Sequence, residues 1–111
     1  PHPKLKYPGS YEFAKKYLDS YGIPPTYHAA SAYAAGEVLE KAILLAKSAD
    51  RDDVRSALKK MNTLTILGRY AVDETGMQIK RFPLVVQWQK GKKEIVWPIE
   101  LQTAPLVIKE K

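Results

Sequence analysis

The sequence predicts an α/β fold in which three helices are followed by short β-hairpins. Up to Asn62, apolar residues recur at helical spacing, with a break formed by Gly22 and the Pro24-Pro25 pair. After Asn62 the period changes to two, and β-branched residues appear between glycine-containing turns. A chain of 111 residues with 45% hydrophobic residues is long enough for one domain with a modest core.

The longest helical signal runs from Thr26 to Ser48 and organises the rest of the chain. It follows a proline pair and contains no proline itself. Its first half is rich in alanine, which lets other parts of the molecule approach the backbone, and its second half carries larger aliphatic side chains. The residues predicted to form its packing face are Ala30, Tyr33, Ala34, Val38, Ala42, Leu45 and Ala46.

Two shorter helices flank this segment. The first is predicted to be capped by Ser10 and to end at Gly22, which suits the left-handed position after a helix. Its apolar face is Phe13, Ala14, Tyr17, Leu18 and Tyr21. The second runs from Arg51 to Met61, with Asp50 as its cap and Asn62 at its end. Its predicted buried edge is Val54, Ala57, Leu58 and Met61.

The remaining segments predict two hairpins. Thr63 to Val72 is strand-like with a break at Gly68, and a turn over residues 73–76 leads into a strand from Met77 to Ile79. The second hairpin pairs Leu84–Gln89 with Glu94–Pro98 through Lys90-Gly91. A two-residue loop there sets Leu84 opposite Trp97 and Val86 opposite Ile95, and a four-residue loop preserves the same facing. This register places on one face Leu84, Val86, Trp88, Ile95 and Trp97.

Charge and composition exclude several classes of protein. The net charge of +6 comes from lysine and arginine pairs spread along the chain, without a basic stripe, so solvated surface explains it better than a nucleic-acid interface. No run approaches the roughly 20 apolar residues of a membrane span, and the first ten residues, PHPKLKYPGS, do not form a signal peptide. The absence of cysteine excludes disulfides and thiolate metal sites.

The titratable residues form no catalytic pattern. His2 and His28 lie far apart, without the spacing of metal ligands, and the adjacent carboxylates suit a helix start and a turn. The six glycines are isolated, so the chain has no glycine-rich phosphate loop. We therefore expect no enzymatic activity, no cofactor and no metal.

Three stretches follow one another in an order and spacing that are more specific than any one of them. They are YGIPPTYHAASAYAAGEVLEKAI, DRDDVRSALKKMNTLTILGRYAVDETGMQI and FPLVVQWQKGKKEIVWP. Together they resemble the C-terminal part of type I periplasmic solute-binding proteins, in the leucine/isoleucine/valine-binding branch that serves ABC importers. The resemblance covers the chain from about Ser10 to Ala104.

The resemblance implies a receptor of two α/β lobes, joined by three crossovers, that closes around a small solute and delivers it to a membrane permease. Because relatives are several hundred residues long, it also implies that this chain is a fragment of an extracytoplasmic, periplasmic protein. Residues 1–9 would form an extended lead-in, 10–79 the end of one lobe, 80–83 a crossover or hinge, 84–104 a hairpin of the other lobe, and 105–111 a tail.

The resemblance also implies a site and a class of solute. The start of the long helix faces the cleft in relatives, so Tyr27 and His28 are the candidate ligand-lining residues; the alternative is that they cap and pack the helix. The family carries amino acids and related acids or amides. A ligand that touches only these two residues would stay mostly hydrated, so negligible affinity is expected there for the isolated chain.

Two further expectations remain. Exposed apolar strand faces favour association, so we expect the isolated chain to form a homo-oligomer, by exchange of the C-terminal hairpin about the hinge at residues 80–83. The alternative function is a small basic module that binds nucleic acid or another anion through Trp88, Trp97 and the loop Lys90–Lys93.

Overall fold

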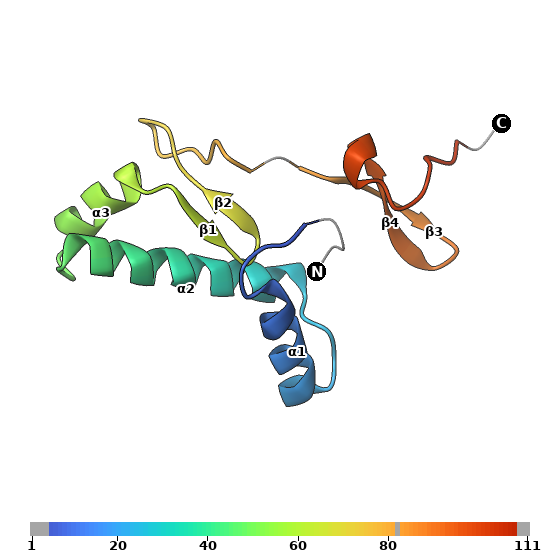
Figure 1. Cartoon of the computed structure of the whole chain (residues 1–111), viewed down its shortest axis with the longest axis horizontal. Coiled ribbons are helices and arrows are strands. Elements are labelled where there is room, and N and C mark those ends of the chain that lie inside the picture. Colours follow the sequence, from blue (N-terminus) through green and yellow to red (C-terminus); the bar gives the residue numbers. More distant parts are fainter. Residues whose placement is uncertain (1–4, 82, 109–111) are drawn as a thin grey trace. The chain divides into compact units, whose positions relative to one another are not determined.

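The computed structural model describes residues 5–81 and 83–108. In chain order its elements are α1 (Ser10–Tyr21), α2 (Tyr27–Ala46), α3 (Arg51–Lys60), β1 (Thr63–Thr65), β2 (Gly68–Tyr70), β3 (Val85–Gln89), β4 (Lys92–Trp97) and the 3-10 helix η1 (Ile99–Leu101). Within these residues, three helices precede two antiparallel strand pairs, which confirms the predicted fold class. The chain divides after residue 81 into two compact units, residues 1–81 and 82–111 (Figure 1).

The N-cap of helix α1 lies one residue before the predicted one. Gly9, in the left-handed conformation, is the N-cap, and Ser10 is already helical, with its N–H donating to the Tyr7 carbonyl (3.2 Å). The Ser10 cap is therefore wrong, because glycine adopts the positive φ of 72° that this turn needs. Gly22 ends the helix as predicted, and its N–H donates to the carbonyl of Leu18 (2.8 Å).

The predicted apolar face of α1 is only partly covered. No described residue of this helix is fully buried. Phe13, Ala14 and Tyr17 are half-buried, whereas Leu18 and Tyr21 are exposed. In the first unit, α1 therefore leaves one end of its apolar side open to solvent.

Helix α2 is the longest element and carries the packing of the first unit. Its N-cap is Thr26, whose hydroxyl accepts the N–H of Ala29 (3.2 Å). Ala34 and Ala42 are buried, but Tyr33 and Leu45, which the sequence placed on the same face, are exposed. The covered stripe is narrower than predicted because the closest packing against it comes from α3 and β1 (Figure 1).

The core of the first unit lies between α2 and α3. Its buried residues are Ala42, Val54, Ala57 and Met61, bordered by half-buried Val38, Ile43, Ala46, Leu58 and Tyr70. Asp50 caps α3 as predicted, since its carboxylate accepts the N–H groups of Asp52 (3.0 Å) and Asp53 (3.5 Å). The predicted buried edge of this helix is confirmed.

The strand that was predicted from Thr63 to Val72 is folded back on itself. β1 pairs antiparallel with β2, so that Thr63 lies opposite Tyr70 and Thr65 opposite Gly68. The buried Thr65 hydroxyl closes the turn by donating to the Gly68 carbonyl (2.9 Å). The hairpin predicted around residues 73–76 is confirmed next to its turn, where Val72 forms an antiparallel bridge with Gln78. The N–H groups of Asp73 and Ile79 donate to the carbonyls of Met77 and Ala71, both at 2.9 Å.

Two charged side chains, one turn apart on α2, attach β1 to the helix. A Glu37 carboxylate oxygen accepts the N–H of Ile66 (2.9 Å). The Lys41 ammonium donates to the Thr63 hydroxyl (3.1 Å) and to the Leu64 carbonyl (2.7 Å). These contacts satisfy backbone groups of the turn and of the strand that would otherwise need water.

The second unit is the hairpin β3–β4 with η1 and the segment that follows. The two-residue loop at Lys90-Gly91 and the pairing of Val86 with Ile95 agree with the prediction. A register shift between Val85 and Val86 then pairs Trp97 with Val85 instead of Leu84. Paired residues lie on the same side of a ladder, whereas the neighbours Val85 and Val86 lie on different sides of their strand. Trp97, which is paired with Val85, is therefore on the other side of the hairpin from Val86 and Trp88. The predicted common face of the two tryptophans is wrong.

The other side of this hairpin is covered by the chain itself. Gln87 forms two hydrogen bonds with the backbone of Val107, and Gln89 donates to the Pro105 carbonyl (2.8 Å). Thr103 exchanges hydrogen bonds with the backbone of Ile95. Among residues 83–108 the buried ones are Val96 and Leu101, so the core that they form is small.

We predict that Ala42→Leu lowers the free energy of unfolding by about 1 to 3 kcal/mol, because the core between α2 and α3 has no room for the added carbon atoms. Ala42 is fully buried there. Chemical denaturation measures the change. Ala35→Leu, at an exposed position of the same helix, is the matched control and should leave stability nearly unchanged. Equal losses in the two variants would contradict this core.

The turn at residues 73–76 is held by a single carboxylate. Asp73 accepts the Thr75 hydroxyl (2.7 Å), the Thr75 N–H (2.9 Å) and the Met77 N–H (3.0 Å). The Thr75 hydroxyl and then the Met77 N–H hold the pKa of Asp73 below its ordinary value of 3.8. These bonds favour the charged form, so their contribution to stability is complete above that value and is lost as the pH falls through the lower, folded pKa.

We therefore predict that Asp73→Asn destabilises the first unit at pH 7 and that the difference from the wild type narrows below about pH 4. Denaturant unfolding at a series of pH values measures this. Glu74→Gln removes a charge from the same turn at an exposed position and serves as the control. A wild-type to Asp73→Asn difference that is constant from pH 7 to pH 2 would show that the carboxylate does not hold the turn.

Candidate functional site

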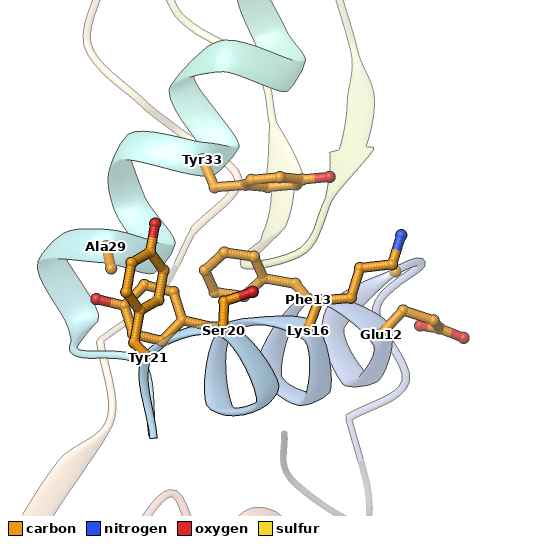
Figure 2. Close-up of a pocket in the computed structure, with 9 residues that line it drawn as sticks. Glu12, Phe13, Lys16, Ser20, Tyr21, Ala29 and Tyr33 are labelled. Atoms are coloured by element: carbon orange, nitrogen blue, oxygen red, sulfur yellow. The ribbon is translucent and has the colours of Figure 1, made fainter. Parts of the chain in front are cut away.

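Among the cavities lined by described residues of the first unit, three differ in their chemistry. The first, the aromatic pocket, has a volume of about 460 Å³ and lies between α1 and the start of α2 (Figure 2). It lies within the size range of small-molecule sites. Its lining includes Glu12, Phe13, Lys16, Tyr17, Tyr21 and Tyr33.

The rings of the aromatic pocket are in contact along α1 and across to α2. Ring centroids are 4.6 Å apart for Tyr17 and Tyr21, 5.9 Å for Phe13 and Tyr17, and 4.7 Å for Phe13 and Tyr33. In Figure 2 the Tyr33 ring lies over Phe13. These tilted arrangements are favourable for aromatic pairs, so the rings support one another and hold α1 against α2.

The second cavity contains the first of the two predicted ligand residues. It has a volume of about 560 Å³, and Tyr27 lines it together with Tyr11, Leu18, Pro25 and Ile66. The His28 ring lies against Tyr27, with a centroid distance of 3.8 Å and an angle of 33° between the ring planes. His28 is not part of the cavity wall. The structure therefore brings the two side chains together, but only Tyr27 faces this cavity.

The third cavity, the donor pocket, is the smallest, at about 140 Å³. It lies between α2 and the segments that follow β1, and its polar lining includes Ser31, Arg69, Gln78 and Arg81. The Gln78 amide oxygen accepts the N–H groups of Ala71 (3.0 Å) and Lys80 (3.1 Å), which fixes the orientation of the amide.

Sequence reasoning missed both the aromatic pocket and the donor pocket. The tyrosines on α1 were interpreted as a packing face, and their helical spacing is the signal for the row of rings. The donor pocket joins Ser31 to Arg81, which are distant in sequence, and no local pattern connects them.

The described residues provide neither a metal site nor a membrane-spanning helix. Residues 5–81 and 83–108 contain no group of three or more His, Cys, Asp or Glu that could hold a metal ion. No helix in this part of the chain is both long enough and apolar enough to cross a membrane. In the second unit, the Lys93 ammonium lies 5.3 Å from the centroid of the Trp88 ring, on the side of the hairpin opposite to Trp97.

Comparison with known families supports a solute-binding role, the first of the two functions that the sequence suggested. A family model described as periplasmic binding protein matches residues 1–93. The chain belongs to the periplasmic binding protein family. The match spans all of the first unit and continues through the loop of hairpin β3–β4.

Membership of the periplasmic binding protein family implies a role in solute binding and transport, outside the cytoplasm. Its members are generally binding proteins and not enzymes, in agreement with the sequence analysis. The resemblance found in the sequence is thus confirmed at the level of the periplasmic binding protein fold.

Proposed function

We propose that this chain serves in a two-lobed extracytoplasmic receptor that captures a small organic solute and delivers it to the permease of an ABC importer in the membrane. The family match over residues 1–93 carries this proposal. The solute class is an amino acid or a related acid or amide, as in the leucine/isoleucine/valine-binding branch, and the compartment is the periplasm.

Tyr27 and His28 are the proposed ligand-lining residues. They begin α2, and their rings lie against each other, so each limits the movement of the other. The Tyr27 side chain is 73% exposed, which leaves most of its surface available to a ligand or to a second lobe. Aromatic rings with a polar tip suit a small solute that has both apolar and polar parts.

The division after residue 81 is compatible with the proposed lobes. Residues 10–79 would complete one lobe, residues 80–83 would be the crossover, and residues 84–104 would belong to the other lobe. Phe82 lies outside the described residues. The cleft would then form where a second wall closes over the start of α2.

We predict that Tyr27→Ala weakens solute binding by the complete receptor at least fivefold, because about 1 kcal/mol of contact with the ring is lost. Calorimetric titration with the transported solute measures it. Tyr21→Ala is the matched control, since Tyr21 is similarly exposed, at 67%, but lies in the aromatic pocket. Unchanged affinity in Tyr27→Ala, or an equal loss in Tyr21→Ala, would remove Tyr27 from the site.

The second unit supports the proposal that the isolated chain associates with itself. Val86 and Trp88 lie on the side of the hairpin away from the glutamines that bind the following segment, and both are exposed. Ile99 beyond the hairpin is exposed as well. An apolar sheet face of this kind favours contact with another copy.

We predict that the isolated chain forms a dimer or larger oligomer and that Trp88→Ser shifts it toward the monomer. Light scattering over a range of concentrations measures the mass. Tyr11→Ser is the control, because Tyr11 is an equally exposed aromatic residue of the first unit, at 68% against 67% for Trp88. A wild-type chain that stays monomeric at high concentration would contradict the proposed association.

A further inference from the structure

The lining of the donor pocket is unusual in its charge. Two arginines, Arg69 and Arg81, contribute to it, and none of its lining residues is acidic. Its remaining walls come from the small or apolar residues Ala34, Val38, Leu67 and Gly68, together with Thr65 and Tyr70. A positive charge beside low-dielectric walls attracts anions and repels cations.

Several polar groups of the pocket already bind to other parts of the chain. The Thr65 hydroxyl accepts the Leu67 N–H (3.2 Å) while it donates to Gly68, and the Tyr70 hydroxyl uses its proton to donate to the Leu58 carbonyl (3.2 Å). The Gln78 amide oxygen accepts two backbone N–H groups. What this glutamine still offers a ligand is its NH₂ group, which only donates.

The charged groups that remain available are donors. Arg69 uses one guanidinium nitrogen to bind the Asn62 side chain (2.7 Å), and its other N–H groups make no hydrogen bond with a described residue. Arg81 and the Ser31 hydroxyl likewise have no hydrogen-bond partner among the described residues. A carboxylate is an acceptor-only group that matches guanidinium and amide donors in geometry and charge.

We propose that the donor pocket binds the carboxylate of a small organic acid, with Arg81, Arg69, Gln78 and Ser31 as its hydrogen-bond donors. A volume of about 140 Å³ suits a carboxylate with a short carbon chain, and the apolar walls are complementary to that chain. The site is separate from Tyr27 and His28. Its role in selecting the solute rests on the proposed receptor function, whereas the binding itself rests only on this pocket.

The test uses the chain and three small probes. Propionate, its neutral isostere propionamide, and inorganic phosphate are titrated at low ionic strength, and binding is followed by NMR at the backbone amides of Ser31 and Gly68 and at the Gln78 side-chain NH₂. Propionate should produce saturable shifts at these groups. Propionamide should not, because it lacks the charge that the arginines require.

Variants then identify the donors. Arg81→Gln should weaken propionate binding about twofold to fivefold, as expected for an exposed charge pair. Gln78→Glu keeps a side-chain oxygen that can accept the Ala71 and Lys80 N–H groups, but it replaces the NH₂ donors with a negatively charged oxygen, so propionate shifts should disappear. Arg55 is an exposed residue of α3 and does not line the pocket, so Arg55→Gln should leave binding unchanged.

Three outcomes would overturn the proposal. Equal shifts with propionamide would show that charge plays no part, and equal or tighter binding of phosphate would assign the pocket to anions in general. Unaltered binding in Gln78→Glu with native unfolding behaviour would place the ligand elsewhere. If propionate binds as expected but Tyr27→Ala leaves receptor affinity unchanged, the carboxylate site stands and only the assignment of Tyr27 fails.

Discussion

The first unit depends on the close approach of other elements to one stripe of α2. Alanine at the centre of the core allows α3 to pack directly on this helix, and Glu37 and Lys41, one turn apart, attach β1 and its turn through their charged ends. Apolar contact and hydrogen bonds to backbone groups therefore act on the same helix. Because the β1–β2 ribbon has only short strands, it would be marginal without this support.

The three cavities are consequences of how α2 is covered. Toward its end the helix is covered by α3, in its middle by the ribbon, and near its start by the aromatic rings of α1. The spaces left between these partners differ in chemistry. The cavity near α1 is aromatic, the one at Tyr27 is mostly apolar, and the donor pocket beside the ribbon is positively charged. A receptor that recognises a small solute with apolar and charged ends needs both apolar and charged surfaces. The proposed carboxylate site would bind the charged end.

The two units differ in how they hide apolar surface. The first has a core between two helices. In the described part of the second, Val96 and Leu101 are buried, and glutamine and threonine hydrogen bonds hold the segment that follows the hairpin. Those polar contacts cover one side of the hairpin and leave Trp88 and Val86 exposed on the other. This asymmetry is the physical basis for the proposed association of isolated chains and for a second lobe in the complete receptor.

Local patterns in the sequence determined the three helices, the cap of α3 at Asp50, the stop at Gly22 and the loop at Lys90-Gly91, because caps, helical periodicity and positive φ angles depend on neighbouring residues. Order and spacing of motifs also determined the family. Only the tertiary structure decided which side of α2 is covered, since exposed Tyr33 and Leu45 have the same periodicity as buried Ala42. The tertiary structure also decided how the strands pair. The Thr65 hydroxyl donates to the Gly68 carbonyl and closes the turn at which the first predicted strand reverses direction. One register shift places Trp97 on the other side of its hairpin. The donor pocket was invisible in the sequence because its charge and its free donors come from segments that meet only when the chain folds.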